Sequence, residues 1–422
     1  MRAGFLAAAA AVLVVVSAVA YLVTRPSLPP PPPAAAWSAR PLVAANLPTG
    51  GLAHSCLLTE AGTAFCWGGN SYAQLGEGTN RLSLLPKAVR ADSFLTALDA
   101  GDSHTCAVTR EGAVLCWGLN PRLQAGTSKD ANCIVGGLSY ACNPTPQPVR
   151  DVPALRAVGA GADHSCGLTR DGHVWCWGSN DRGQLGRGRD PGSFPPLEVG
   201  GGTRFAALSV GAFHSCGVTA AGAVLCWGWN LYGQLGAAAR AERCGPNPWS
   251  PTPCLRQPVR AEARVRFTAV AAGSKHTCAL AADSTAYCWG GNRLGQLGTG
   301  DTVHAMTPRA VAGARRFRAL TVGTDFSCAV APDGASWCWG DNALGQLGGT
   351  DRAGSATPMR VRVEERFASI GAGASHACGV LESGAAVCWG AGTAGQLGNG
   401  FRSDRREPVT VQGDAAQRRR AP

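Results

Sequence analysis

Short apolar runs occur in pairs along this chain, and a three-residue loop ending in glycine separates the members of almost every pair. In the first copy this loop is 60–62. A three-residue hairpin loop favours glycine in its last position, because the backbone there adopts a positive φ that a Cβ atom disfavours. Counting outward from the loop pairs Thr59 with Thr63 and places Cys56 directly opposite Cys66. The pattern therefore predicts an antiparallel β-hairpin with two facing cysteines.

The hairpin recurs seven times, and successive copies begin 50 to 62 residues apart. Trp-Gly follows the second cysteine in every copy, and in most copies an asparagine and a Gly-Gln-Leu-Gly turn come next. A strand opened by proline then follows, as in Pro308–Val311, and a further short strand such as Phe317–Leu320 leads into the next hairpin. Four strands per unit make one propeller blade, and a period of this size is typical of repeat architectures. The sequence thus predicts an all-β, seven-bladed β-propeller of four-stranded blades, preceded by an N-terminal hydrophobic helix and a Pro-rich linker.

The third copy, residues 164–186, reads His-Ser-Cys-Gly-Leu-Thr-Arg-Asp-Gly-His-Val-Trp-Cys-Trp-Gly-Ser-Asn-Asp-Arg-Gly-Gln-Leu-Gly. This pattern resembles the repeat of the regulator of chromosome condensation family, and the resemblance extends over residues 48–411. It implies a seven-bladed ring closed by strands from both chain ends, so that Pro408–Val411 is expected to complete the first blade beside Pro48–His54. It also implies two alternative functions, since eukaryotic members are guanine-nucleotide exchange factors and secreted bacterial members inhibit β-lactamase. The Gly-Trp-Arg-His-Thr motif of the plant ultraviolet-photoreceptor branch is missing from this sequence.

The N-terminus indicates export. Gly4–Val23 is uncharged and apolar, which is long enough to span a bilayer as a helix. Ala18-Val19-Ala20 offers a small-residue cleavage site, so the segment is either a signal anchor or a signal peptide. We therefore expect an exported, bacterial-type family member, anchored in the membrane with its propeller in the periplasm or extracellular space, or secreted. The predicted segments are 1–24, the anchor or signal peptide; 25–40, the Pro-rich linker; 41–411, the propeller; and 412–422, a basic disordered tail.

The cysteines are predicted to form disulfides. Both members of the hairpin pair are present in all seven copies, whereas small buried apolar residues would drift to alanine or valine. The total of 18 leaves none over, which in an exported protein favours oxidised pairs. The expected pairs are Cys56–Cys66, Cys106–Cys116, Cys133–Cys142, Cys166–Cys176, Cys216–Cys226, Cys244–Cys254, Cys278–Cys288, Cys328–Cys338 and Cys378–Cys388.

Histidine precedes the first cysteine by two positions in six copies, and Phe326 replaces it in the sixth. Histidine–cysteine clusters can bind zinc or act as catalytic pairs. Here they are spread one set per blade, and disulfides would remove the thiolates. No glycine-rich phosphate loop or recurring carboxylate pair is present. We therefore expect structural, hydrogen-bonded histidines near the hub, no metal, no cofactor, no catalytic residue and no enzymatic activity. The histidines concerned are His54, His104, His164, His214, His276 and His376.

The formal net charge of +11 raises the question of nucleic-acid binding. Only three of the 38 basic residues are lysine, and with the abundant alanine this favours a bias in composition over a designed basic surface. We therefore expect no nucleic-acid partner.

Two copies carry insertions between the Gly-Gln-Leu-Gly turn and the proline strand, each with its own cysteine pair. Insertions on repeat scaffolds commonly lie on the binding face, although they can also be tolerated surface loops. Tyr140 and Trp249 lie within them and are the candidate partner-binding residues, since aromatic side chains make good interface anchors. The sequence thus predicts a non-catalytic protein-interaction propeller outside the cytoplasm. Its expected partners are an unidentified protein or cell-surface polymer, and the membrane through the N-terminal helix.

Overall fold

A computed structural model describes residues 48–126, 131–188, 191–200, 202–238, 242–245, 251–351 and 353–413. The expected N-terminal anchor, the Pro-rich linker, Trp249 and the last nine residues of the expected tail lie outside the described residues. Within these ranges, no helix is both long enough and apolar enough to cross a membrane.

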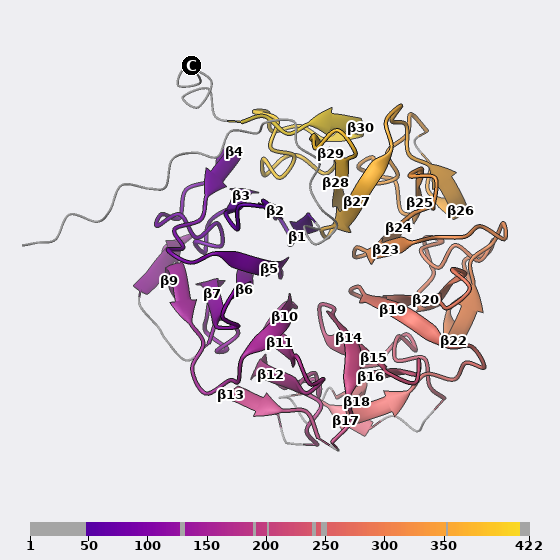
Figure 1. Ribbon diagram of the computed structural model, residues 1–422, viewed down its shortest axis with the longest axis horizontal. Helices are drawn as coiled ribbons and strands as arrows, with labels where there is room; N and C mark the ends of the chain where they lie inside the picture. Colours follow the sequence, from indigo (N-terminus) through magenta and orange to yellow (C-terminus); the bar gives the residue numbers. More distant parts are fainter. Residues whose placement is uncertain are drawn as a thin grey trace, which may run out of the picture. The chain divides into compact units, whose positions relative to one another are not determined.

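The described chain forms seven antiparallel sheets arranged around a centre, one per blade, and the predicted seven-bladed propeller is confirmed (Figure 1). The innermost strands are β1 (Thr49–Gly50), β5 (Leu95–Ala100), β10 (Leu155–Ala160), β14 (Phe205–Val210), β19 (Phe267–Ala272), β23 (Ala319–Val322) and β27 (Phe367–Ala372). The second strands are β2 (His54–Leu58), β6 (His104–Thr109), β11 (His164–Thr169), β15 (His214–Thr219), β20 (His276–Ala281), β24 (Phe326–Val330) and β28 (His376–Leu381). The third strands are β3 (Ala64–Gly68), β7 (Val114–Leu119), β12 (Val174–Ser179), β16 (Val224–Trp229), β21 (Ala286–Gly290), β25 (Ser336–Gly340) and β29 (Ala386–Gly390).

The fourth strands are β4 (Ser83–Ala88), β9 (Leu138–Pro148), β13 (Ser193–Glu198), β18 (Thr252–Arg260), β22 (Ala305–Ala310), β26 (Ser355–Arg360) and β30 (Arg405–Thr410). Each insertion adds a fifth strand at the outer edge, β8 (Ala131–Val135) in the second blade and β17 (Glu242–Cys244) in the fourth. Because strand direction alternates, the loops after the first and third strands lie on one side of the ring. We call this side the turn face, and the other the hairpin face.

The predicted hairpin register is found, with Cys56 paired with Cys66. The amide of Thr59 donates to the carbonyl of Thr63 over 3.0 Å, so by alternation the cysteines occupy a non-hydrogen-bonded pair, where side chains approach most closely. Seven such cross-strand disulfides have Cα–Cα distances of 4.0–4.1 Å. Cys133–Cys142 and Cys244–Cys254 are also bonded, and no cysteine is free.

The fifth hairpin keeps the loop geometry without glycine. Ser284 stands at the position of Gly62 and has a φ of 69°, close to the 73° of that glycine. The carboxylate of the preceding Asp283 accepts hydrogen bonds from the amide and hydroxyl of Thr285, both over 3.0 Å. The loop thus adopts the left-handed conformation, with Asp283 bonded to the residue that follows it.

The expected closure of the ring was wrong. β30, which contains Pro408, pairs with β29 in the last blade, whereas the first blade consists of β1, β2, β3 and β4. Beside the expected segment 48–54, β2 is paired with β1 on one side and with β3 on the other, so the C-terminal strand does not occupy that place. The first and last blades are instead joined by individual hydrogen bonds, such as that from Gly400 to the carbonyl of Leu84 at 3.1 Å.

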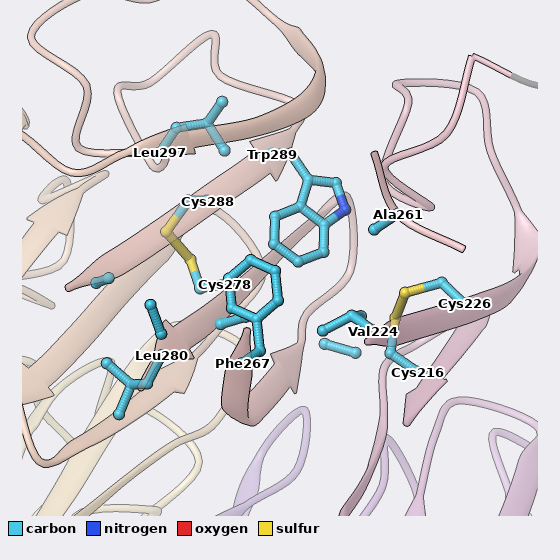
Figure 2. Close-up of a cluster of buried hydrophobic side chains, with 14 of the residues drawn as sticks. Cys216, Val224, Cys226, Ala261, Phe267, Cys278, Leu280, Cys288, Trp289 and Leu297 are labelled. Carbon is cyan, nitrogen blue, oxygen red and sulfur yellow. A yellow bond between two sulfur atoms is a disulfide. The ribbon is translucent and has the colours of Figure 1, made fainter. Parts of the chain in front are cut away.

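The core lies between adjacent blades (Figure 2). Trp289 of the fifth blade packs with Phe267 at a ring separation of 6.4 Å, in a buried cluster that includes the Cys216–Cys226 disulfide of the fourth blade. The final glycine of the turn is required by this packing. A Cβ atom on Gly236 would lie 2.7 Å from the Trp289 indole nitrogen.

Candidate functional site

The repeated histidines connect one blade to the next at six of the seven contacts between blades. The His104 Nε2 atom lies 2.8 Å from the Ser165 hydroxyl, which in turn donates to the carbonyl of Gln124 over 2.9 Å. Because that hydroxyl has given its proton to a carbonyl, it accepts from the imidazole, which fixes the Nε2–H tautomer. Trp177 donates to the same Gln124 carbonyl over 3.0 Å. The repeated histidine, serine and tryptophan therefore form hydrogen bonds that hold one blade to the next.

These histidines are unsuited to catalysis. All six are buried, and burial lowers their pKa from 6.5 to about 3, or about 4 for His376. Their Nδ1 atoms are buried and have no hydrogen-bond partner among the residues that the structure describes. They remain neutral at physiological pH and are enclosed between blades. In the part of the chain that the structure describes, no three histidine, cysteine, aspartate or glutamate residues are grouped to hold a metal ion.

Between the sixth and seventh blades, both partners of the hydrogen bond from histidine to hydroxyl are replaced. Phe326 takes the histidine position, and Ala377 takes the serine position on the next blade. Both residues are completely buried. Replacing both members of a buried hydrogen bond by apolar groups costs little, whereas removing one leaves the other unsatisfied. The phenylalanine in the sequence is therefore explained by its neighbour one blade away.

We expect Phe326→His alone to lower the free energy of unfolding by about 1–3 kcal/mol, because the new imidazole faces Ala377 and lacks an acceptor. Adding Ala377→Ser should recover about 1 kcal/mol, since it restores the bond found at the other seams. Urea denaturation of the two single variants and the double variant measures the coupling free energy. Purely additive effects would contradict this explanation.

The central channel is lined by the inner strands and encloses a cavity of about 340 Å³. Asp99 lies on its wall and is held between blades, since it accepts from the Thr49 hydroxyl over 2.6 Å and from the Ala160 amide over 2.9 Å. Burial nevertheless raises the pKa of Asp99 to about 6. Ser209 and Thr321 at equivalent positions likewise accept from the next inner strand. These polar side chains join blades and are already occupied by hydrogen bonds.

One group of residues that do not repeat lies on the turn face of the third and fourth blades. Phe213 and Trp229 pack edge to face at 5.8 Å, and Trp229 packs similarly on Tyr232 at 5.5 Å. The Arg182 guanidinium from the preceding blade lies 3.9 Å from the centre of the Phe213 ring, a cation–π arrangement. We call these four residues the aromatic cluster. The Trp229 indole nitrogen has no hydrogen-bond partner among the described residues.

Two carboxyls connect the channel with the aromatic cluster, since Asp102 lines the channel and Asp163 interacts with the Arg182 charge. Burial, with the nearby Asp163 charge as a second cause, raises the pKa of Asp102 to about 6. Burial also raises the pKa of Asp163, against the effect of the Arg122 and Arg182 charges. The turn face over blades two to four thus combines these carboxyls with the aromatic cluster, whose aromatic and arginine side chains are of the types enriched at protein interfaces.

One of the two predicted partner-binding residues, Tyr140, lies within the described residues. Tyr140 on β9 is half-buried and packs edge to face on Tyr72 of the first blade, with ring centres 5.5 Å apart. The predicted partner-binding residue Tyr140 therefore packs between the first and second blades. Trp249, the other predicted partner-binding residue, lies outside the described residues. The aromatic cluster is not among the sites predicted from the sequence. The available signal was the variation immediately before each repeated histidine and after each Trp-Gly, where Phe213 and Trp229 stand.

Comparisons with known proteins agree on the family. The sequence profile of the RCC1-like domain matches residues 144–421, and profiles of the regulator of chromosome condensation (RCC1) repeat match 95–124 and 61–108. The ultraviolet-B receptor UVR8 of Arabidopsis thaliana is 28% identical over 189 residues, 44% of this chain and 41% of the receptor. The human E3 ubiquitin-protein ligase HERC2 is 28% identical over 65% of this chain, and the match covers 4% of HERC2. The chain thus spans less than half the length of these curated relatives.

Solved structures share the fold. Yeast RCC1 (Prp20), solved bound to Kap60, superposes with a TM-score of 0.73 at 21% identity, over 93% of this chain and 90% of that one. Human WBSCR16 superposes with a TM-score of 0.71 at 22% identity, over 83% and 94% of the two chains. At this identity the likeness establishes the propeller alone. With the profile match over most of the chain and seven blades built from the repeat, the chain belongs to the RCC1-like domain family.

Proposed function

We propose that this chain is a non-catalytic protein-interaction propeller that works outside the cytoplasm and binds its partner through the turn face. One observation carries the proposal. The residues that build the ring repeat from blade to blade, whereas the Arg182, Phe213, Trp229 and Tyr232 side chains occur in one sector of the turn face. Aromatic and arginine side chains are the types most enriched at binding hot spots.

Other features support the extracellular setting and the absence of catalysis. Nine disulfides are typical of an oxidising compartment, because cytosolic thiols are kept reduced. The repeated histidines are neutral and enclosed, so they lack the access that acid–base chemistry requires. Among the relatives by fold, yeast Prp20p was solved in a study of its binding to Gsp1p and histones, which are protein partners. This precedent supports a protein as the partner of the present ring.

The capture of a partner from a native extract by the immobilised full-length chain tests this proposal. The triple variant Arg182→Ala, Trp229→Ala, Tyr232→Ala should lose at least 90% of the captured protein. The matched control is Arg315→Ala with Trp337→Ala, which removes a similar stack, 3.5 Å from guanidinium to ring centre, on the hairpin face. Trp249→Ala tests the second anchor predicted from the sequence.

Equal capture by the wild type and the triple variant would contradict a binding site at the aromatic cluster. The identity of the captured protein separates the two alternatives. A small GTPase would indicate nucleotide exchange, and an exported enzyme would indicate inhibition.

A further inference from the structure

The outer edge of a β-sheet exposes unpaired backbone groups, and proteins usually protect such edges with proline, charge or very short strands. In the blades without an insertion, this propeller protects the outer edge strand with proline. The fourth strands of the five blades without an insertion all contain proline: Pro86, Pro195 with Pro196, Pro308, Pro358 and Pro408. The short edge strand β17 has Glu242 and Arg243 instead, and Glu242 pairs with Arg256 at 3.1 Å.

β8 is the exception among the described edge strands. Its five residues, Ala131–Val135, include no proline and no charge, and residues 131–149 contain no charged side chain at all. In the described part of the chain β8 pairs with β9 alone. Ile134 is 60% exposed, and Leu138 on the returning strand is 62% exposed. An exposed, uncharged edge with apolar side chains is therefore available here.

The hairpin register shows which backbone groups are free. Val135 pairs with Leu138 across Gly136 and Gly137, whose φ values of 58° and 81° are those of a type I′ turn. Such a turn makes the flanking residues a hydrogen-bonded pair, and alternation then directs the N–H and C=O groups of every second residue away from the partner strand. Asn132 and Ile134 are the residues that direct these groups outward.

The hairpin is also fixed in place before any partner arrives. Cys133 and Cys142 tie β8 to β9, and both are buried together with Ala73 of the first blade. The carbonyl of Pro144 accepts from the Gly78 amide over 3.1 Å, which anchors the base of the hairpin to the neighbouring blade. A strand held in this way loses little conformational entropy on binding.

We propose that the β8 edge binds an extended segment of a partner protein by strand addition, so that the segment becomes a sixth strand of the second blade. Backbone hydrogen bonds to Asn132 and Ile134 supply the pairing, and Ile134 supplies an apolar contact. The segment is uncharged where it pairs and acidic in its flanks, because the net charge of +11 attracts acidic chains and opposes a second copy of this protein. The proposal rests on the proposed function, and it names the partner's conformation and charge.

The test uses a labelled synthetic peptide of sequence Glu-Glu-Thr-Val-Thr-Val-Thr-Glu-Glu and the full-length chain, with binding followed by fluorescence anisotropy. Ile134→Pro removes an outward-directed amide without breaking a β8–β9 hydrogen bond, so the hairpin should still form. An intact Cys133–Cys142 disulfide and an unchanged unfolding midpoint will show that it does. We expect this variant to bind at least tenfold more weakly than the wild type. Ile134→Ser, which keeps the amide, should stay within about threefold.

Equal binding by the wild type and Ile134→Pro would overturn strand addition. Sedimentation that shows a dimer abolished by Ile134→Pro would assign the edge to a second copy and would also overturn the proposal. Failure here is distinct from failure of the proposed function, since capture that depends on the aromatic cluster would persist in the Ile134→Pro variant.

Discussion

Acidification from pH 7 to pH 4 is expected to unfold the ring in one cooperative step. Six histidines are buried as neutral bases, with folded pKa values of about 3 to 4 against 6.5 for the exposed side chain. Between pH 6.5 and these values the unfolded chain binds more protons than the folded chain, so stability falls as the pH falls. Each histidine therefore lowers the free energy of unfolding by about 1.4 kcal/mol for every unit by which the pH falls across that window.

Buried aspartates oppose this effect in part. The pKa values of Asp99 and Asp102 are raised to about 6 from 3.8, so between these limits the folded chain binds the additional protons. Protonation there stabilises the folded state as the pH falls, and Asp163 shifts in the same direction. The two carboxyls raised to about 6, against six lowered imidazoles, leave a net uptake of about four protons on unfolding, which the raised pKa of Asp163 reduces further. The predicted slope is therefore at most about 5 kcal/mol per pH unit near pH 5.

Urea unfolding followed by tryptophan fluorescence at pH 7, 6, 5 and 4 measures this slope. The matched control is His276→Phe with Ser327→Ala, which reproduces the apolar pair found naturally at Phe326 and Ala377. For this variant, the slope of the free energy of unfolding against pH should be smaller than that of the wild type by about 1.4 kcal/mol per pH unit. An unfolding midpoint that does not change between pH 7 and pH 5 would show that the histidines are not responsible.

The blade itself could be predicted from the sequence because its signals are local and recur. The loop at Gly62 specifies the register between two adjacent strands, and that register alone determines that Cys56 faces Cys66. Seven repetitions of such a unit then specify the number of blades. The Phe326 replacement could have been resolved in the same way, by comparing each histidine with the serine position of the following copy, where Ala377 stands.

The parts that depend on contacts between distant segments could not be predicted. Seven similar repeats do not specify which blade receives the C-terminal strand, and the resemblance to the family indicated a place beside Pro48–His54, whereas the structure pairs β30 with β29 in the last blade. The aromatic cluster combines residues from two successive copies, Arg182 from one and Phe213, Trp229 and Tyr232 from the next. By contrast, the β8–β9 hairpin had a local signal, Gly136-Gly137 between two apolar runs, that the sequence analysis did not use.

Reduction of the disulfides is expected to have the largest effect on stability. A crosslink between cysteines ten residues apart stabilises the folded state by about 2–3 kcal/mol in the chain-entropy model, and seven blades each contain one. Their sum, about 14–21 kcal/mol, exceeds the roughly 5–15 kcal/mol by which most domains are stable.

The chain treated with dithiothreitol should therefore lose its cooperative unfolding transition, whereas the oxidised chain keeps it. A single-blade variant, Cys166→Ala with Cys176→Ala, should lose about 2–3 kcal/mol. Cys133→Ala with Cys142→Ala is the comparison variant, because this crosslink spans nearly the same number of residues and the chain-entropy model predicts a similar loss for it. Thiol titration of the purified chain in guanidinium, without reductant, should find no free thiol. A titre near 18 would show that the ring is stable without its crosslinks and would remove the argument for an oxidising compartment.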